Sequence, residues 1–223
     1  MDISKVKLYD LSLTIYHGCP AYPRMPVPQI TRTSHRVREG YNAETMVVSS
    51  HLVTHVDTPD HFYDGAGDCV SLPLERFWGR GVFVDLREKI GPDEPIGPEL
   101  LAPWLTEIQE GDFVLINTGW NQRRGFEEDY LKKWPYLDGP GAQALKDLKV
   151  KAVGIDALSL GGHGSREKAR PCHEILLGAG ILVIEEVNFP QEVMDGKKRL
   201  VSAFPLKIAG GSASPVRIVA YDF

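Results

Sequence analysis

The sequence is poor in the features that mark secreted and membrane-spanning proteins. Its three cysteines, Cys19, Cys69 and Cys172, are widely separated and form no disulfide or metal-binding pattern. No apolar run approaches the roughly 20 residues that a membrane span requires. The N-terminus lacks the apolar core and the small-residue cleavage site of a signal peptide. We therefore expect a protein of the reducing cytoplasm.

Positive charge is also in short supply. The chain has 25 Lys and Arg against 30 Asp and Glu, a net charge of −5, which argues against nucleic acid or an anionic membrane as the main partner. The composition, 43% hydrophobic and 25% charged, is that of an ordinary globular protein. We find no repeat, low-complexity tract or linker. We expect a single domain over residues 1–223 that acts on a small molecule.

Histidine, by contrast, is concentrated in one stretch. Three of the seven histidines fall within eleven residues, and an aspartate lies between the second and third: His51, His55, Asp57 and His61. All four have odd numbers, so in an extended chain their side chains share one face. A helix is excluded because Asp57 would turn away from the histidines and because Pro59 lacks the amide hydrogen that a helix needs.

Four potential ligands on one face indicate a metal site. A straight strand would separate His51 and His55 by about 13 Å. That is near the outer limit for two imidazoles meeting at one ion, because each Zn–N bond is only about 2 Å. The chain must therefore bend here, or two ions must share the ligands, which the two oxygens of Asp57 allow. Imidazole and carboxylate without thiolate suit Zn, Mn, Fe or Ni.

The remaining pattern predicts an α/β fold with a mixed central sheet and flanking helices. We expect strands over residues 7–15, 29–38, 41–50, 81–86, 113–118, 152–156, 181–187, 201–208 and 215–223, and helices over 71–77, 99–109, 123–134, 141–148 and 171–177. A hairpin turn at Glu39-Gly40 joins the second and third strands. The third strand leads directly into the histidine motif. The run 113–118 lacks alternation, which is typical of burial on both faces.

Two carboxylates interrupt the apolar strand at residues 181–187. Glu185 and Glu186 follow each other there, and an ionised carboxylate is costly to bury unless it is paired or bound to a metal. One of the two should alternate outward, and the other should face a partner. Glu186 and Glu174 are the alternatives if Glu185 is not a ligand.

The motif and two further segments resemble the cyclase-like metal-dependent hydrolases, a family that includes bacterial kynurenine formamidase and isatin hydrolase. The motif, with Thr54 and Pro59 in place, is similar to the family signature HxGTHxDxPxH. Residues 71–85 are similar to its downstream lPle…G…vvDl segment, and His173 followed by Glu185 is similar to its second ligand pair. The resemblance extends from about Leu8 to the C-terminus.

This resemblance implies a swivelling β/β/α fold and homodimers or larger oligomers. It implies one or two divalent ions, with zinc preferred over manganese. His51, His55 and Asp57 would hold the first ion. Asp57, His173 and Glu185 would hold the second, with Asp57 bridging the two.

The resemblance gives His61 the role of general acid/base. A metal lowers the pKa of bound water to about 7, and the ordinary pKa of histidine, about 6.5, suits a shuttle that moves a proton from that water to the leaving nitrogen of an amide. A fourth metal ligand is the other role open to His61. One position departs from the signature: Val53 replaces a glycine, which permits backbone angles closed to a β-branched residue. This bears on the substrate more than on the metal.

The residues leave several functions open. An aryl formamide such as N-formylkynurenine, a cyclic amide such as isatin, and an unrelated amide all fit as substrates. A non-catalytic module stabilised by a metal is a different class, but structural zinc sites are more often closed by Cys and His. A metal-dependent oxygenase needs only two histidines and a carboxylate as ligands. That function would give His61, His173 and Glu185 no role at the metal.

Overall fold

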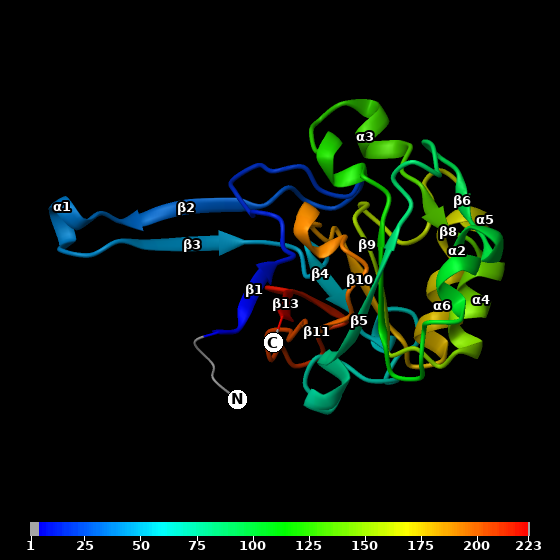
Figure 1. Cartoon of the computed structure of the whole chain (residues 1–223). Helices are drawn as coiled ribbons and strands as arrows, with labels where there is room; N and C mark the ends of the chain where they lie inside the picture. The colour runs from blue at the N-terminus through cyan, green and yellow to red at the C-terminus, as the bar shows by residue number, and fades with distance from the viewer. Residues whose placement is uncertain (1–4, 223) are drawn as a thin grey trace.

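A mixed sheet of nine strands forms the centre of the molecule in the computed structural model, which describes residues 5–222 (Figure 1). The strand order is β1-β13-β11-β5-β7-β9-β10-β4-β12. Its middle consists of four parallel neighbours, β5 (Trp78–Asp85), β7 (Phe113–Asn117), β9 (Ala152–Ile155) and β10 (Leu182–Glu185). Every residue of β7, β9 and β10 is buried, as expected for strands covered on both faces.

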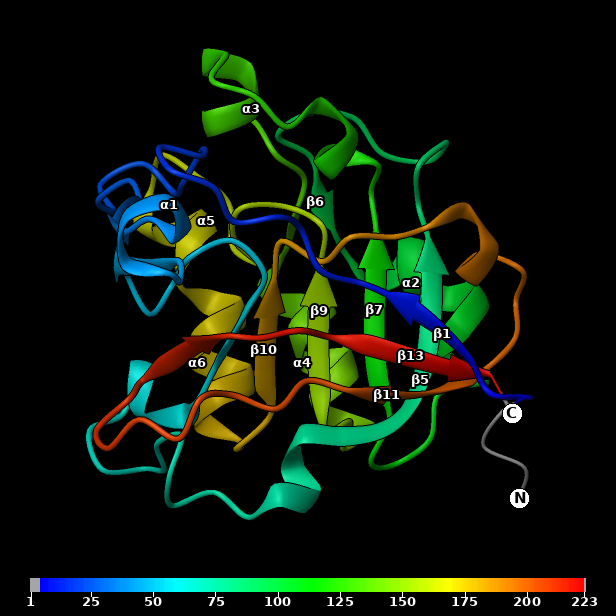
Figure 2. The ribbon, with the colours of Figure 1, turned by 90° about the vertical axis from the view of Figure 1, so that its left-hand side faces the viewer.

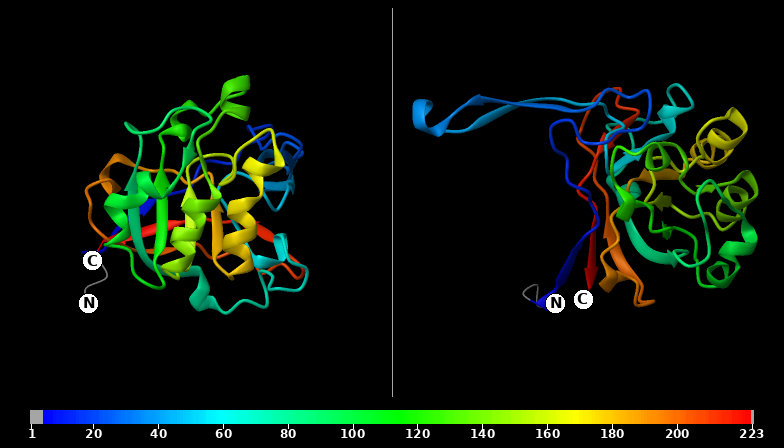
Figure 3. Two further views of the ribbon diagram at one scale, coloured as in Figure 1. Left: turned by 90° about the vertical axis from the view of Figure 1, so that its right-hand side faces the viewer. Right: turned by 90° about the horizontal axis from the view of Figure 1, so that it is seen from above.

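Helices cover one face of these parallel strands. They are α2 (Pro98–Leu105), α4 (Gly139–Asp147) and α6 (Pro171–Gly178), with the short α5 (Arg166–Ala169) beside them (Figure 1; Figure 3, left). Proline stands in the first turn of all three longer helices, where its missing amide hydrogen costs nothing. Val114, Ile116 and Val153 point into the core under the helices.

Antiparallel strands cover the opposite face. The sheet curls so that β1 (Lys7–Asp10), β13 (Val219–Asp222) and β11 (Arg199–Ser202) cross in front of the parallel strands (Figure 2). A second core lies between the two layers and includes Phe113, Leu115 and Ile184. The result is a β/β/α arrangement, so the expected fold class is confirmed.

Two short strands extend the far edge of the sheet. β4 (His55–Asp57) pairs antiparallel with β10, and β12 (Ala213–Pro215) pairs antiparallel with β4. The remaining elements are β6 (Pro95–Ile96) with β8 (Tyr136–Leu137), α3 (Glu128–Lys132), and the short 3-10 helices η2 (Pro59–His61), η3 (Leu74–Phe77), η4 (Trp120–Arg123) and η5 (Gln191–Val193). β4 therefore carries the centre of the histidine motif into the main sheet.

A long hairpin projects from the body. β2 (Gln29–Ser34) and β3 (Ala43–Val47) pair with each other and, in the described part of the chain, with no other strand. The tip between them is the short helix α1 (Arg36–Glu39), which ends at Gly40 in the left-handed conformation. Figures 1 and 3 show this hairpin extending away from both layers. The predicted hairpin is confirmed, but its strands are shorter than the expected ranges 29–38 and 41–50, and α1 takes the place of the expected turn at Glu39-Gly40.

Several predicted boundaries are wrong for identifiable reasons. The first strand ends at Asp10 rather than residue 15, and Ser12 retains only an isolated bridge to Val187. The strand predicted over 201–208 ends at Ser202, because Pro205 has no amide hydrogen for a strand ladder. The helix predicted over 123–134 shrinks to α3, since Gly125 disfavours helix before it. Residues 1–4 and Phe223, the last residue of the final predicted strand, lie outside the described residues.

No helix within residues 5–222 has the length and apolar character needed to cross a bilayer.

Candidate metal centre

The centre of the site is an antiparallel pairing between β4 and β10. His55 and Asp57 are two residues apart on β4, so their side chains leave the strand on the same face. Glu185, the last residue of β10, lies directly opposite His55 in the register. All three side chains are buried. Two segments that are 130 residues apart in sequence thus bring an imidazole and two carboxylates together.

Bends on either side of β4 add the other two histidines of the motif. Before the strand, Val53 has φ 51°, in the left-handed region, and the chain turns so that His51 comes back toward Asp57. After the strand, the turn η2 carries His61 to the same place, with its ring centroid 4.1 Å from that of His51. The expected bend is present, and His51 and His61 are not on the strand itself.

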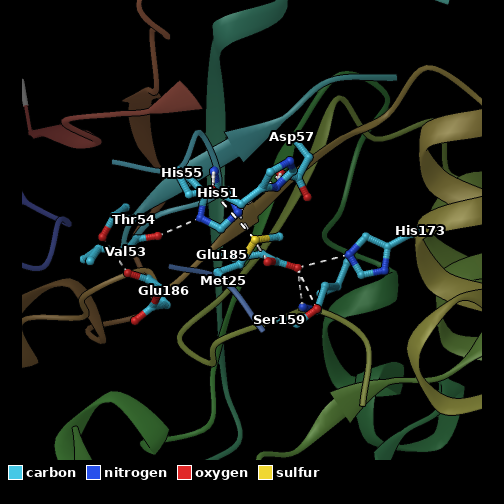
Figure 4. A network of polar contacts seen from close by, with 12 residues as sticks. Met25, His51, Val53, Thr54, His55, Asp57, Ser159, His173, Glu185 and Glu186 are labelled. Carbon is cyan, nitrogen blue, oxygen red and sulfur yellow. Dashed lines mark hydrogen bonds and ion pairs between the residues drawn. The ribbon is translucent and has the colours of Figure 1, made fainter. Parts of the chain in front are cut away.

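The fifth potential ligand comes from a helix. His173 lies on α6, buried, and its Nε2 is 3.1 Å from Oε1 of Glu185. Figure 4 shows His51, His55, Asp57, His173 and Glu185 facing a common region. The structure therefore brings together all five residues that were predicted from the sequence as metal ligands.

Close polar contacts link the members of this cluster. The Nδ1 of His51 is 2.9 Å and the Nε2 of His55 is 3.3 Å from the same oxygen, Oδ1 of Asp57. The Nε2 of His55 is also 3.4 Å from Oε2 of Glu185. Two overlapping groups have ligand atoms close enough to share an ion, one of His51, Asp57 and His61, the other of His55, Asp57 and Glu185. Asp57 belongs to both, as a bridging carboxylate would.

The orientation of the imidazoles fits metal binding. Nδ1 of His55 donates to the carbonyl oxygen of Val53 at 2.7 Å, and Nδ1 of His173 donates to that of Ala169 at 3.0 Å. Each ring therefore directs its Nε2 into the cluster, which is how backbone acceptors orient metal-binding histidines.

Burial alone would lower the pKa of both imidazoles, but Asp57 beside His55, and Cys172 and Glu185 beside His173, outweigh it and hold both pKa values well above the usual value. A cation bound here would displace the Nε2 proton and take the lone pair. Within residues 5–222, Nε2 of His55 and both carboxylate oxygens of Asp57 are buried without a hydrogen-bond partner. Buried polar atoms are rarely left unpaired, so a divalent cation fits this donor set.

The electrostatics of the cluster favour ionised carboxylates. Burial alone would raise the pKa of Asp57, but the nearby charge of His55 outweighs it and holds that pKa well below its usual value. Burial would also raise the pKa of Glu185, yet the hydrogen bond from His173 leaves it lowered. Both groups are thus in the form that binds a cation. His61 differs: burial lowers its pKa to about 4, so its imidazole is neutral at neutral pH.

The other two candidate carboxylates do not join the cluster. Glu174 pairs with Arg170 at 2.7 Å, and both side chains are half-buried at the surface, outside the cluster. Glu186 points away from Glu185 in Figure 4, and burial raises its pKa to about 7. Its backbone has φ 53°, in the left-handed region. Of Glu185 and Glu186, only Glu185 faces the imidazoles of the cluster.

Sequence reasoning missed the residues that hold Glu185 in place. The hydroxyl of Ser159 and the backbone amide of Leu160 both donate to Oε1 of Glu185, at 2.9 and 2.7 Å. Both belong to the glycine-rich loop 159–165, in which Gly161 packs against the backbone of Ala169 so closely that a Cβ would lie 2.2 Å from its carbonyl oxygen. The glycines of this loop can be read from the sequence, but its contact with Glu185 depends on the tertiary structure.

The cluster opens into a pocket of about 200 Å³. Its other walls are mainly apolar or aromatic and include Tyr22, Met25, Phe62 and Leu158. Phe62 stacks on His173 with ring centroids 5.2 Å apart, which fixes this wall against the cluster. Tyr22 and Met25 come from the proline-rich loop before β2, which therefore walls a pocket rather than only connecting strands.

Comparison with known proteins identifies the family of this chain. The family model described as "Putative cyclase" matches residues 9–161, more than half of the chain. The chain belongs to the cyclase family. This family member is 30% identical to the kynurenine formamidase of Geobacillus thermodenitrificans over 212 residues, covering 93% of this chain and 94% of that enzyme. It is 27% identical to the isatin hydrolase of Roseibium aggregatum, over 78% of this chain and 73% of the relative.

Solved structures show how far the cyclase fold is shared. An isatin hydrolase bound to the product analogue thioisatinate superposes with a TM-score of 0.89 at 22% identity, covering 98% of this chain and 93% of that one. A "predicted metal-dependent hydrolase" from Bacillus stearothermophilus gives a TM-score of 0.78 at 28% identity, covering 98% and 99%. The first likeness establishes the fold. The second adds a relative described as metal-dependent.

The left-handed backbone at Val53 leads to a stability prediction. An L-residue in this conformation costs about 1–2 kcal/mol, which glycine does not incur. Val53→Ala and Val53→Gly both remove the two buried γ-methyl groups, and only Gly also removes the Cβ that is strained in this conformation. We therefore expect the Gly variant to be about 1 kcal/mol more stable than the Ala variant. Chemical denaturation measures both. Val56, buried on β4 in an extended conformation, is the control position. There the Ala variant should be more stable than the Gly variant. If Val53→Ala were also more stable than Val53→Gly, the left-handed backbone at Val53 would be contradicted.

Removal of the shared carboxylate should abolish metal binding. Asp57→Asn replaces two anionic oxygens by one neutral oxygen and an NH₂ group. We expect its affinity for Zn²⁺ to fall by more than about 100-fold, because mutation of a residue that only supports a ligand already lowers metal affinity by about 10–100-fold. Asp60→Asn, three residues away on η2 with its carboxylate on the amide of Gly65, is the control and should keep its metal. Equilibrium dialysis with metal analysis measures both, and a metal-replete Asp57→Asn protein would rule out the assignment.

Proposed function

We propose that this protein is a metal-dependent hydrolase that cleaves the C–N bond of a small aryl amide, with an aryl formamide as the preferred substrate. The observation that carries the proposal is the buried cluster of imidazoles and carboxylates, with the Nε2 atoms of His55 and His173 directed inward and one side open to an aromatic pocket. The relatives named kynurenine formamidase and isatin hydrolase support it, since both names denote amide hydrolysis.

His51, His55 and Asp57 would hold a first divalent ion, and Asp57, His173 and Glu185 a second. When bound, such an ion supplies a Lewis acid that polarises the substrate carbonyl and makes water acidic enough to react at neutral pH. Zinc fits the mixed imidazole and carboxylate donors, and manganese is the alternative.

His61 would move the proton. Its ring lies beside His51 at the mouth of the cluster and lines the pocket. With its pKa lowered to about 4 by burial, the imidazole is neutral at neutral pH and has a free nitrogen to accept the proton of the attacking water. The same nitrogen then returns the proton to the departing amine as the C–N bond breaks. The fourth-ligand role stays open, since His61 also lies within ligand distance of Asp57.

The pocket supports a small, flat substrate. Its volume of about 200 Å³ lies below the roughly 300–1,000 Å³ of pockets for drug-sized ligands, and Tyr22 and Phe62 offer aromatic surfaces. A formylated aniline ring fits these dimensions. A cyclic amide such as isatin is the second candidate, favoured by the relative named for it. A purely structural metal site is disfavoured because the cluster faces a pocket instead of being closed by protein on all sides.

Further proposals accompany this one. The chain functions as one domain and in the cytoplasm, with a small molecule as its substrate and no nucleic acid or membrane as partner, and the family resemblance implies a homo-oligomer. The net charge of −5 supports the absence of an anionic partner, and the three buried free cysteines support the reducing location.

Hydrolysis of a small panel tests the activity. Purified protein loaded with Zn²⁺ or Mn²⁺ should hydrolyse formanilides or cyclic amides, lose that activity in a chelator, and regain it when the metal is restored. Thermal unfolding in the same samples reports metal binding without turnover, because an ion that binds only the folded state raises the melting temperature. Metal-dependent stability with no hydrolysis of any panel member would favour the non-catalytic module.

The role of His61 gives a separate prediction. His61→Ala should retain its metal and lose about 10²–10⁴-fold in kcat, the usual contribution of a positioned acid/base. His163→Ala is the control, since that histidine packs on Trp134 and does not line the pocket. Loss of metal from His61→Ala would instead assign His61 as a ligand.

A further inference from the structure

One charged side chain of the pocket wall has no part in the metal centre. Arg170 lies directly before α6 and lines the pocket beside Phe62 and His173. It is the only arginine or lysine among the described residues that line this pocket. A positive charge therefore borders the space that the proposed substrate would fill.

Two contacts hold the guanidinium of Arg170 in place. Its Nε donates to Oε1 of Glu174, one turn further along α6, at 2.7 Å. Its central carbon lies over the ring of Phe62, 5.2 Å from the ring centroid, in a cation–π arrangement. Phe62 in turn stacks on His173. The guanidinium is therefore positioned relative to the metal centre before any ligand binds, which lowers the entropic cost of binding.

Most hydrogen-bond donors of this guanidinium are unused. The pair with Glu174 engages Nε alone, and within residues 5–222 neither Nη1 nor Nη2 of Arg170 has a hydrogen-bond or ion-pair partner. The side chain is 42% exposed, so these nitrogens lie where the pocket meets solvent. Two parallel N–H groups of a guanidinium match the two oxygens of a carboxylate. The free donors are thus suited to an anionic group that enters with the substrate.

A second arginine lies on the loop that forms another wall of the pocket. Tyr22 and Met25 both line the pocket, and the amide of Met25 donates to the carbonyl oxygen of Tyr22 at 2.9 Å, which closes a turn between them. Arg24 is the third residue of this turn and has φ 91°, a conformation that favours glycine. Its side chain is exposed and has no hydrogen-bond or ion-pair partner in the described part of the chain. Backbone strain of this kind is concentrated at functional sites, and here it places a free positive charge between two wall residues.

Charge distinguishes this side of the pocket from the rest of the protein. The chain has a net charge of −5, whereas Arg170 and Arg24 bring positive charge to the pocket wall and its loop. An anionic ligand is therefore attracted here and repelled by most of the remaining surface. The pocket volume of about 200 Å³ is small enough for one molecule to place an amide at the metal centre and a charged group at Arg170.

From these contacts we infer that Arg170 is a specificity-determining residue, and that the preferred substrates are aryl amides with a carboxylate on a short ring substituent. This role rests on the proposed function and deepens it, since it names the group that the pocket selects. A neutral aryl amide reaches the same metal centre but gains no charge-assisted hydrogen bond from Arg170.

Two matched pairs of compounds test the role of Arg170. 3-(3-Formamidophenyl)propanoate and its 4-formamido isomer carry a carboxylate, and their primary carboxamides have nearly the same shape without the charge. The Zn²⁺-loaded wild-type protein should hydrolyse at least one acid with a kcat/KM at least about 10-fold above that of its carboxamide, the effect of one charge-assisted hydrogen bond. Most of the difference should lie in KM, because Arg170 binds a group that does not react.

Variants assign the preference to one side chain. Arg170→Gln should abolish it, and Arg170→Lys, which keeps the charge but lacks the planar fork, should retain part of it. The ratio compares two substrates on one protein sample, so a partial loss of folded protein cancels. Arg166→Gln, the control, removes the same charge from α5 outside the pocket and should keep the full preference. A wild-type protein that prefers neither acid, an Arg170→Gln variant that keeps the preference, or an Arg166→Gln variant that loses it equally would overturn this role of Arg170.

Binding of the amine products separates this role from the proposed hydrolysis. 3-(3-Aminophenyl)propanoate, its 4-amino isomer and their primary carboxamides bind without turnover, and isothermal titration calorimetry measures each Kd. The wild-type protein should bind at least one acid at least about 10-fold more tightly than its carboxamide, and Arg170→Gln should bind both members of the pair equally. Selective binding of an acid without hydrolysis of any formamide would defeat only the proposed function. Hydrolysis of the formamides with no selectivity for the acids, in rate or in binding, would defeat only the role of Arg170.

Discussion

The pairing of β4 with β10 is the interaction on which the site depends. It sets His55 opposite Glu185 and Val183 opposite Asp57. Because side chains alternate along a strand, a shift of one residue would turn His55 and Asp57 into the core and move Val56 to the cluster. The short strand β4 is held on its other side by β12. The register is thus fixed from two directions, and with it the distances between the ligands.

The same pairing concentrates charge where water is excluded. Two ionised carboxylates and several imidazoles lie together, almost completely buried, and such a cluster is costly unless its charges are compensated. Part of the compensation is local, since Ser159 and Leu160 donate to Glu185. Asp57 has no hydroxyl or backbone amide of this kind beside it; its Oδ1 lies near only the imidazoles of His51 and His55, and a bound cation would be its natural partner. The stability of the fold and occupancy of the site are therefore expected to be linked.

Backbone strain lies on both sides of this pairing. Val53, before β4, and Glu186, after β10, are two of the few non-glycine residues with positive φ. Thr54 connects them, because its hydroxyl donates to the carbonyl oxygen of Glu186 at 2.6 Å and accepts from the amide of Leu13 at 2.8 Å. Residues kept in sparsely populated conformations persist when their surroundings determine them. Here the surroundings are the two turns that aim His51 into the site and Glu186 out of it.

The sequence by itself determined the class of fold and which residues would gather. The apolar runs of β7 and β9 and the order of strands and helices are local patterns, and they correctly indicated an α/β fold. The odd-numbered spacing places His55 and Asp57 on one face of β4, whereas His51 and His61 reach the cluster through the bends on either side. The tertiary structure decided what depends on distant neighbours. It showed that Glu185, and not Glu186, faces the cluster, because the register between β4 and β10 depends on both strands and cannot be derived from either one alone. It also showed that the β2–β3 hairpin projects from the body, because alternation along a strand does not specify which other element, if any, will cover its side chains.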